Sequence, residues 1–160
     1  MGLLSRWRRG AVENEVQISE EDGIRYLHLG SDTIQSGMRM SDPHELVLSY
    51  TRSMLAFLLF APEPARLVNI GLGGGSLAKW IHRHLAATQQ VVLELNPAVI
   101  TCARTYFHLP RDDKRLLVIE ADGAVWVDAH PACCDVIMVD AYDGRAHAAE
   151  LATPAFYASA

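Results

Sequence analysis

Residues 67–80, LVNIGLGGGSLAKW, join a short apolar segment to a helix-like segment through a loop rich in glycine. Leu67 to Ile70 is typical of a strand that is buried on both faces, and Ser76 to about Leu85 is typical of the helix that follows it. Glycines let the backbone turn tightly and let a ligand approach it closely. The stretch therefore predicts the first strand, loop and helix of a sheet that binds a nucleoside or nucleotide.

The same alternation continues toward the C-terminus. Strand-like segments follow at 91–95, 116–119 and 136–139, and helices are predicted at 97–107 and near Ala124. Repeated strand–helix units with apolar strands predict an α/β fold in which helices cover both faces of a parallel sheet. Right-handed crossovers, with the glycine loop after the first strand, give a Rossmann-like domain with strand order 3-2-1-4.

The N-terminal part has a different pattern. Two hairpins are predicted, one turning at Asp22-Gly23 and one at Ser36-Gly37, and a helix is predicted to begin at residues 41–45 with Asp42 as its cap. Residues 1–62 are thus expected to form β-hairpins and a connecting helix, and residues 63–160 the Rossmann-like domain. Because the chain stops soon after the fourth strand, we expect a truncated sheet or one completed by a partner chain, such as a homo-oligomer.

The composition narrows the function. The 160 residues carry a formal net charge of −5 without a long basic run, which disfavours nucleic-acid binding. No long apolar segment follows the basic N-terminus, so neither a signal peptide nor a membrane association is predicted. The three cysteines, Cys102, Cys133 and Cys134, suggest neither a disulfide framework nor a metal site. A reduced, cytoplasmic setting fits this pattern best.

Acidic residues stand at the ends of the later strands. Glu94 follows the glycine loop by about 20 residues, where a carboxylate can bind both hydroxyls of a ribose. Asp122, which precedes Gly123, can accept a hydrogen bond from an adenine amine or cap the next helix. Asp140 and Asp143 follow the fourth strand. Since the carboxyl ends of parallel strands meet at one edge, these residues are expected to surround one pocket.

The residues after the glycine loop narrow the ligand class further. No lysine stands there in the pattern of a triphosphate-binding loop. Dinucleotide and S-adenosyl ligands therefore remain.

Several motifs add specificity when they are taken together. They run from about Gln35 to Tyr157 and include IGLGGGS at 70–76, LELNP at 93–97, ARTYF at 103–107, ADG at 121–123, CDVIMVDAYD at 134–143 and Phe156-Tyr157. These segments resemble the spermidine synthase (polyamine aminopropyltransferase) family, with its GGGDGG, VEIDP, GDG and YDVIxVDxxD motifs. The resemblance implies transfer of an aminopropyl group from decarboxylated S-adenosylmethionine to a polyamine amine, with no tightly bound cofactor and no metal.

The resemblance also implies roles for individual residues. Asp140 is placed as the proton acceptor, Tyr50 as a catalytic residue that helps to position the attacked amine, and Asp143 and Tyr50 as the residues that hold the amine substrate. The nucleoside-binding set is Gln35, Gly71, Gly73, Gly74, Gly75, Glu94, Asp122 and Gly123.

Departures from the family pattern keep alternatives open. Gly74 stands where the family has the aspartate that binds the aminopropyl ammonium, so intact S-adenosylmethionine is admissible and a methyltransferase is one alternative. Thr51 replaces a His or Gln, and Gly144 replaces a proline. We expect these 160 residues to lack the family's substrate-binding C-terminal half, which favours a second alternative, a non-catalytic nucleoside-binding or oligomerisation module. The glycine loop and Glu94 also permit a dinucleotide oxidoreductase.

Overall fold

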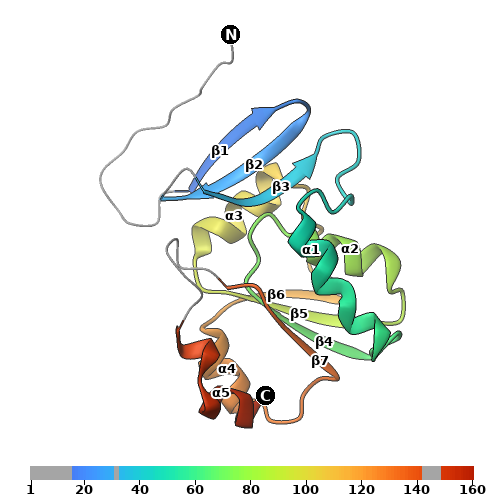
Figure 1. Cartoon of the computed structure of the whole chain (residues 1–160), viewed down its shortest axis with the longest axis vertical. Coiled ribbons are helices and arrows are strands. Elements are labelled where there is room, and N and C mark those ends of the chain that lie inside the picture. The colour runs from blue at the N-terminus through green and yellow to red at the C-terminus, as the bar shows by residue number, and fades with distance from the viewer. Residues whose placement is uncertain (1–15, 31–32, 142–148) are drawn as a thin grey trace.

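The computed structural model describes residues 16–30, 33–141 and 149–160, and it contains two sheets (Figure 1). The first is antiparallel with order β1-β2-β3: Val16–Glu21, Ile24–Leu29 and Ile34–Arg39. The second is parallel with order β6-β5-β4-β7: β4 Arg66–Ile70, β5 Gln89–Glu94, β6 Leu116–Glu120 and β7 Val136–Val139. The predicted α/β Rossmann-like fold and the strand order 3-2-1-4 are confirmed.

Helices cover both faces of the parallel sheet, as Figure 1 shows. They are α1 Ser49–Met54, the 3-10 helix η1 Leu55–Leu59, α2 Ser76–His84, α3 Pro97–Tyr106, α4 Gly123–Ala129, the 3-10 helix η2 Ala149–Ala152 and α5 Pro154–Ser159. On one face Leu77 of α2 packs against Leu67 and Met138. On the other, Val127 and Phe156 pack against the strands from α4 and α5. Within the described ranges, no helix is long and apolar enough to cross a membrane.

The small antiparallel sheet lies against α3. Leu27 and Met38 form a buried cluster with Cys102 and Phe107. The predicted turn between β1 and β2 is confirmed, because Asp22 and Gly23 have φ of 50° and 74°, as a two-residue hairpin turn of the favoured twist requires.

The second predicted hairpin is wrong, because β3 runs without a turn through Ser36 and Gly37. Both residues pair with β2, Ser36 opposite Leu27 and Gly37 opposite Tyr26. A Cβ atom at Gly37 would lie 3.4 Å from the Tyr26 ring. The glycine therefore provides close packing under an aromatic side chain rather than a turn.

The helix predicted to begin at residues 41–45 begins at Ser49 instead. Asp42 does form a local cap-like contact, but its carboxylate accepts the backbone N–H of His44 within a turn, at 3.1 Å. Glu45 forms an ion pair with Arg39 at the end of β3. These contacts hold the segment as a turn, and the helix starts only beyond it.

Lys79 is a buried cation in α2. The residue is 1% exposed, and its ammonium donates a hydrogen bond of 2.7 Å to the carbonyl of Phe107 at the end of α3. Burial lowers the pKa of Lys79 from 10.5 to about 8. The bond joins the glycine-loop helix to the helix beneath the small sheet, although the charge itself opposes folding.

We expect stability to depend on pH through Lys79. Between about pH 8 and 10.5 the native state binds fewer protons than the unfolded chain, so this contribution to the free energy of unfolding rises with pH. From about pH 7.5 to 9, the free energy of unfolding of the wild type should therefore rise by about 1 kcal/mol relative to that of Lys79→Met. Urea unfolding at both pH values measures it, and a difference independent of pH would contradict the lowered pKa.

Candidate functional site

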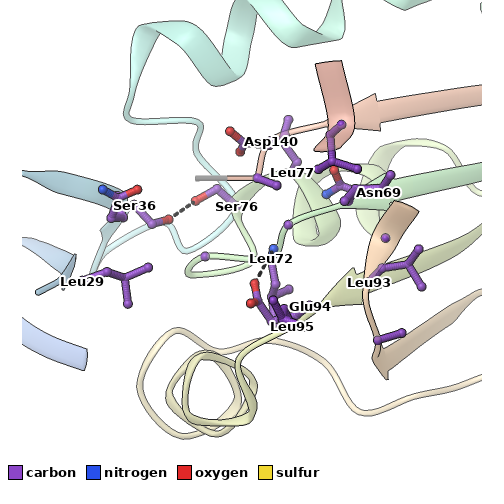
Figure 2. Close-up of a pocket in the computed structure, with 18 of the residues that line it drawn as sticks. Leu29, Ser36, Asn69, Leu72, Ser76, Leu77, Leu93, Glu94, Leu95 and Asp140 are labelled. Atoms are coloured by element: carbon purple, nitrogen blue, oxygen red, sulfur yellow. Dashed lines mark hydrogen bonds between the residues drawn. The ribbon is translucent and has the colours of Figure 1, made fainter. Parts of the chain in front are cut away.

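A pocket of about 200 Å³ lies at the carboxyl ends of the parallel strands, between the large sheet, the end of the small sheet and α1 (Figure 2). The predicted site residues that line it include Gln35, Tyr50, Gly71, Glu94, Asp122 and Asp140. The expectation that three acidic strand ends share one pocket is thus confirmed. Asp143 lies outside the described residues.

Gly71 is the tightest point of the glycine loop. Its φ of 96° is a conformation that other residues rarely adopt, and a Cβ atom there would lie 2.2 Å from the backbone oxygen of Asp140. Its N–H donates to the carbonyl of Leu93 on β5, at 2.8 Å. Gly73, with φ of 53°, also lines the pocket. The loop therefore brings its backbone to the pocket and packs directly on the end of β7.

Gly74 and Gly75 do not line the pocket with the other two glycines. A Cβ atom at Gly74 would meet the Phe107 ring at 2.7 Å and the Ser36 hydroxyl at 2.8 Å, and one at Gly75 would meet Leu109 at 2.8 Å. Both positions are close-packing sites against the protein. Their contact with a nucleoside stays a prediction, and the loop has no space for a carboxylate side chain at position 74.

Glu94 ends β5 and holds the loop. Its carboxylate accepts the backbone N–H of Leu72 at 3.0 Å and that of Asn96 at 2.9 Å. Burial raises the pKa of Glu94, and the backbone hydrogen bonds oppose that shift. Each carboxylate oxygen can accept a second hydrogen bond. The arrangement is thus compatible with the predicted contact to ribose hydroxyls.

We expect Glu94→Ala to weaken nucleoside binding by about 1.5–3 kcal/mol, because hydrogen bonds to a charged acceptor are lost. Calorimetric titration with methylthioadenosine measures the change. Glu120→Ala is the matched control, since Glu120 ends the neighbouring strand opposite Glu94 without lining the pocket. Equal affinities for Glu94→Ala and the control would remove Glu94 from the binding set.

Asp122 acts as the N-cap of α4. Its Oδ1 accepts the backbone N–H groups of Ala124 and Val125 at 2.9 and 3.1 Å, so the helix-capping interpretation is confirmed. The residue also lines the pocket together with Gly123, whose missing Cβ would lie 2.4 Å from Ile70. A contact between Asp122 and adenine stays a prediction.

Tyr50 and Asp140 meet at the end of β7. The Tyr50 hydroxyl donates to Asp140 Oδ2 at 3.2 Å and lies 3.4 Å from the backbone carbonyl of Gln35. Burial, followed by the charge and the hydrogen bond of Asp140, raises the pKa of Tyr50 far above its ordinary value. The phenol therefore stays protonated and orients the carboxylate. The oriented carboxylate of Asp140 can accept a hydrogen bond from an amine that binds next to it.

The electrostatics of the pocket favour a cation. Its charged lining residues in the described part of the chain are Glu94, Asp122 and Asp140, with no Lys, Arg or His among them. A sulfonium or an ammonium would be attracted there, and a phosphate would be repelled. Across residues 16–30, 33–141 and 149–160, no three His, Cys, Asp or Glu side chains form a group that could hold a metal ion.

Four polar residues at the pocket were absent from the predicted set: Ser36, Thr51, Asn69 and Ser76. All four are buried. The hydroxyls of Ser36 and Ser76 lie 3.2 Å apart and connect β3 with the start of α2. The sequence did contain a sign that Asn69 is special, because an amide side chain is unusual in the middle of an apolar strand.

The sequence of this chain matches a known protein family. The family model described as spermine/spermidine synthase domain matches residues 48–160. A polyamine aminopropyltransferase of Neisseria meningitidis is 50% identical over 132 residues, which are 82% of this chain and 50% of that protein. One from Chromobacterium violaceum is 46% identical over 151 residues, covering 93% of this chain and 58% of the relative. The chain thus spans about half the length of these relatives.

The fold comparison agrees. The crystal structure of a probable spermidine synthase from Corynebacterium glutamicum superposes with a TM-score of 0.77 over 96% of this chain and 59% of that one, at 20% sequence identity. That likeness concerns the fold, while the family rests on the sequence match. Because the family model covers well over half of the residues, and because its match includes Tyr50, the glycine loop and all three acidic strand ends, the chain belongs to the spermine/spermidine synthase domain family.

Proposed function

We propose that this chain contains the nucleoside site and the proton acceptor of a polyamine aminopropyltransferase. Its substrates would be decarboxylated S-adenosylmethionine and a polyamine amine, and its setting the cytoplasm. The observation that carries the proposal is the contact between Tyr50 and Asp140 in the lining of a pocket whose described charged residues are all acidic. The relatives that are about half identical to this chain are polyamine aminopropyltransferases, which supports it.

The chemistry follows from this arrangement. An ammonium cannot attack carbon, so the amine must give up a proton, and the Asp140 carboxylate is placed to take it. The amine nitrogen attacks the methylene next to the sulfonium, a C–N bond forms and the C–S bond breaks. The electron pair of the C–S bond goes to sulfur, and methylthioadenosine leaves as a neutral thioether. Tyr50 keeps the carboxylate oriented through its hydrogen bond.

Binding in one pocket supplies much of the rate advantage. Gly71 and Gly73 present backbone to the ligand, and Glu94 is placed for its ribose. When two reactants are held in line, an intermolecular step becomes effectively intramolecular. Asp143 lies three residues after Asp140 in the sequence and is not among the described residues. Its proposed role is to hold the substrate amine.

The experiment uses the full-length protein with decarboxylated S-adenosylmethionine and putrescine, and it measures methylthioadenosine by chromatography. Product that depends on both substrates supports the proposal. A folded protein that binds methylthioadenosine but forms no product would instead support a non-catalytic nucleoside-binding module.

A methyltransferase is the second candidate, and one observation favours it. Position 74 is a glycine with no space for a side chain, so the loop there places no carboxylate against the carboxylate of intact S-adenosylmethionine. Calorimetry with intact and decarboxylated S-adenosylmethionine separates the two functions. A clear preference for the intact molecule would reject aminopropyl transfer, whereas the acidic lining leads us to expect the reverse.

A further inference from the structure

Asn69 is a buried amide in the middle of β4. It is 2% exposed and is flanked in the sheet by Val92 on β5 and Met138 on β7. The α2 face near it is apolar, with Leu77 and Met138 in one buried cluster. An apolar side chain of similar size would fit such surroundings without loss, so the amide calls for another explanation.

The carboxamide oxygen of Asn69 lacks a hydrogen-bond partner among the described residues. Burial without a partner is unfavourable for a polar atom. Thr51, which lies in the same pocket, does not relieve it, because the Thr51 hydroxyl donates to the carbonyl of Leu48 at 2.7 Å. The oxygen is therefore a buried acceptor with an unused hydrogen-bonding capacity in a residue that lines the pocket.

Asn69 lines the same pocket as Tyr50 and Asp140. Figure 2 shows its amide end turned toward Leu77 and the side on which Asp140 lies. Gln90 makes a useful contrast. It is also 2% exposed, and its oxygen has no partner within the described ranges. Its Nε2 donates to the carbonyl of Ala78 at 2.9 Å, however, and the residue does not line the pocket.

We infer that Asn69 is a substrate-binding residue whose side-chain oxygen accepts an N–H from the amine substrate, an inference that rests on the proposed function. A primary amine carries several N–H groups, so one can point to the Asp140 carboxylate and another to Asn69. An alcohol carries a single O–H and cannot satisfy both acceptors. Asn69 would therefore help the pocket to select an amine.

The test is calorimetric titration of putrescine into the full-length protein saturated with methylthioadenosine. The variants are Asn69→Leu, which nearly preserves shape, and Asn69→Val, which suits a strand if the first variant does not fold. Gln90→Leu is the matched control for loss of a buried amide. We expect the Asn69 variants to bind putrescine roughly tenfold more weakly, with methylthioadenosine affinity unchanged. Gln90→Leu should change neither affinity.

Two results would overturn the inference: putrescine affinity equal to that of the wild type in the folded Asn69 variants, or no putrescine binding by the wild type. Formation of methylthioadenosine by the wild type is measured separately and decides the proposed function. If the wild type transfers but the Asn69 variants bind putrescine normally, the inference alone fails. If the variants bind more weakly but the wild type forms no product, the proposed function alone fails.

Discussion

Asp140→Asn is expected to lower the rate of aminopropyl transfer by a factor of about 10²–10⁴, the range that a positioned general base contributes. The amide keeps the shape of the side chain and can still accept the hydrogen bond from Tyr50, but it cannot take a proton from the amine. The proposed nucleoside site depends mainly on the other strand ends, so under that proposal affinity for methylthioadenosine should stay within about twofold. Single-turnover rates and calorimetry on the full-length protein measure the two quantities.

Asp128→Asn is the matched control for this change. Asp128 lies on α4, outside the pocket, where its carboxylate accepts a hydrogen bond from Ser159 at 3.0 Å. The Asp128→Asn variant should transfer the aminopropyl group at the rate of the wild type. If Asp140→Asn lost nucleoside affinity in the same proportion as rate, Asp140 would be a binding residue rather than the proton acceptor.

Gly71→Ala is expected to disrupt the pocket as a whole. The new methyl group would lie 2.2 Å from the Asp140 backbone oxygen, and the backbone at φ of 96° disfavours any side chain. Strain and overpacking together should reduce the free energy of unfolding by roughly 2–5 kcal/mol. Because the loop and the end of β7 must separate to admit the methyl group, nucleoside affinity and transfer should both be lost.

Gly23→Ala separates the two causes. Gly23 also has a left-handed φ, 74°, but nothing lies within 4 Å of its missing Cβ atom. Backbone strain alone should cost about 1 kcal/mol there and leave the pocket intact. Urea unfolding with calorimetry compares both variants, and equal losses of stability would show that contact with Asp140 contributes nothing.

The parallel sheet could be predicted from the sequence because its signals are local. Apolar strands alternate with helices, and right-handed crossovers then leave one strand order. The segment from residue 41 to 48 misled the prediction, since Asp42, Pro43 and Glu45 have the residue types of a helix start. The ion pair of Arg39 with Glu45 involves the preceding strand, and a helix-capping pattern contains no information about it.

The site could be predicted at its acidic strand ends and less well within its glycine loop. Glu94, Asp122 and Asp140 share a pocket because parallel strands end at one edge. The loop pattern did not show that Gly74 packs against Phe107, which depends on how α3 ends some thirty residues later. It also did not show that the Asn69 side-chain oxygen lacks a partner in the part of the chain that the structure describes, because that depends on the neighbours of β4 in the folded sheet.

The hydroxyl of Tyr50 reaches the Asp140 carboxylate across a sequence separation of 90 residues, from a helix outside the parallel sheet. Gln35, on β3, completes the same corner of the pocket. A recombinant module cut just before β4 would keep the acidic strand ends but would lose the phenol that orients one of them. In gene fusion or domain shuffling, a unit that keeps the proposed chemistry would therefore have to include β3 and α1, which precede the parallel sheet.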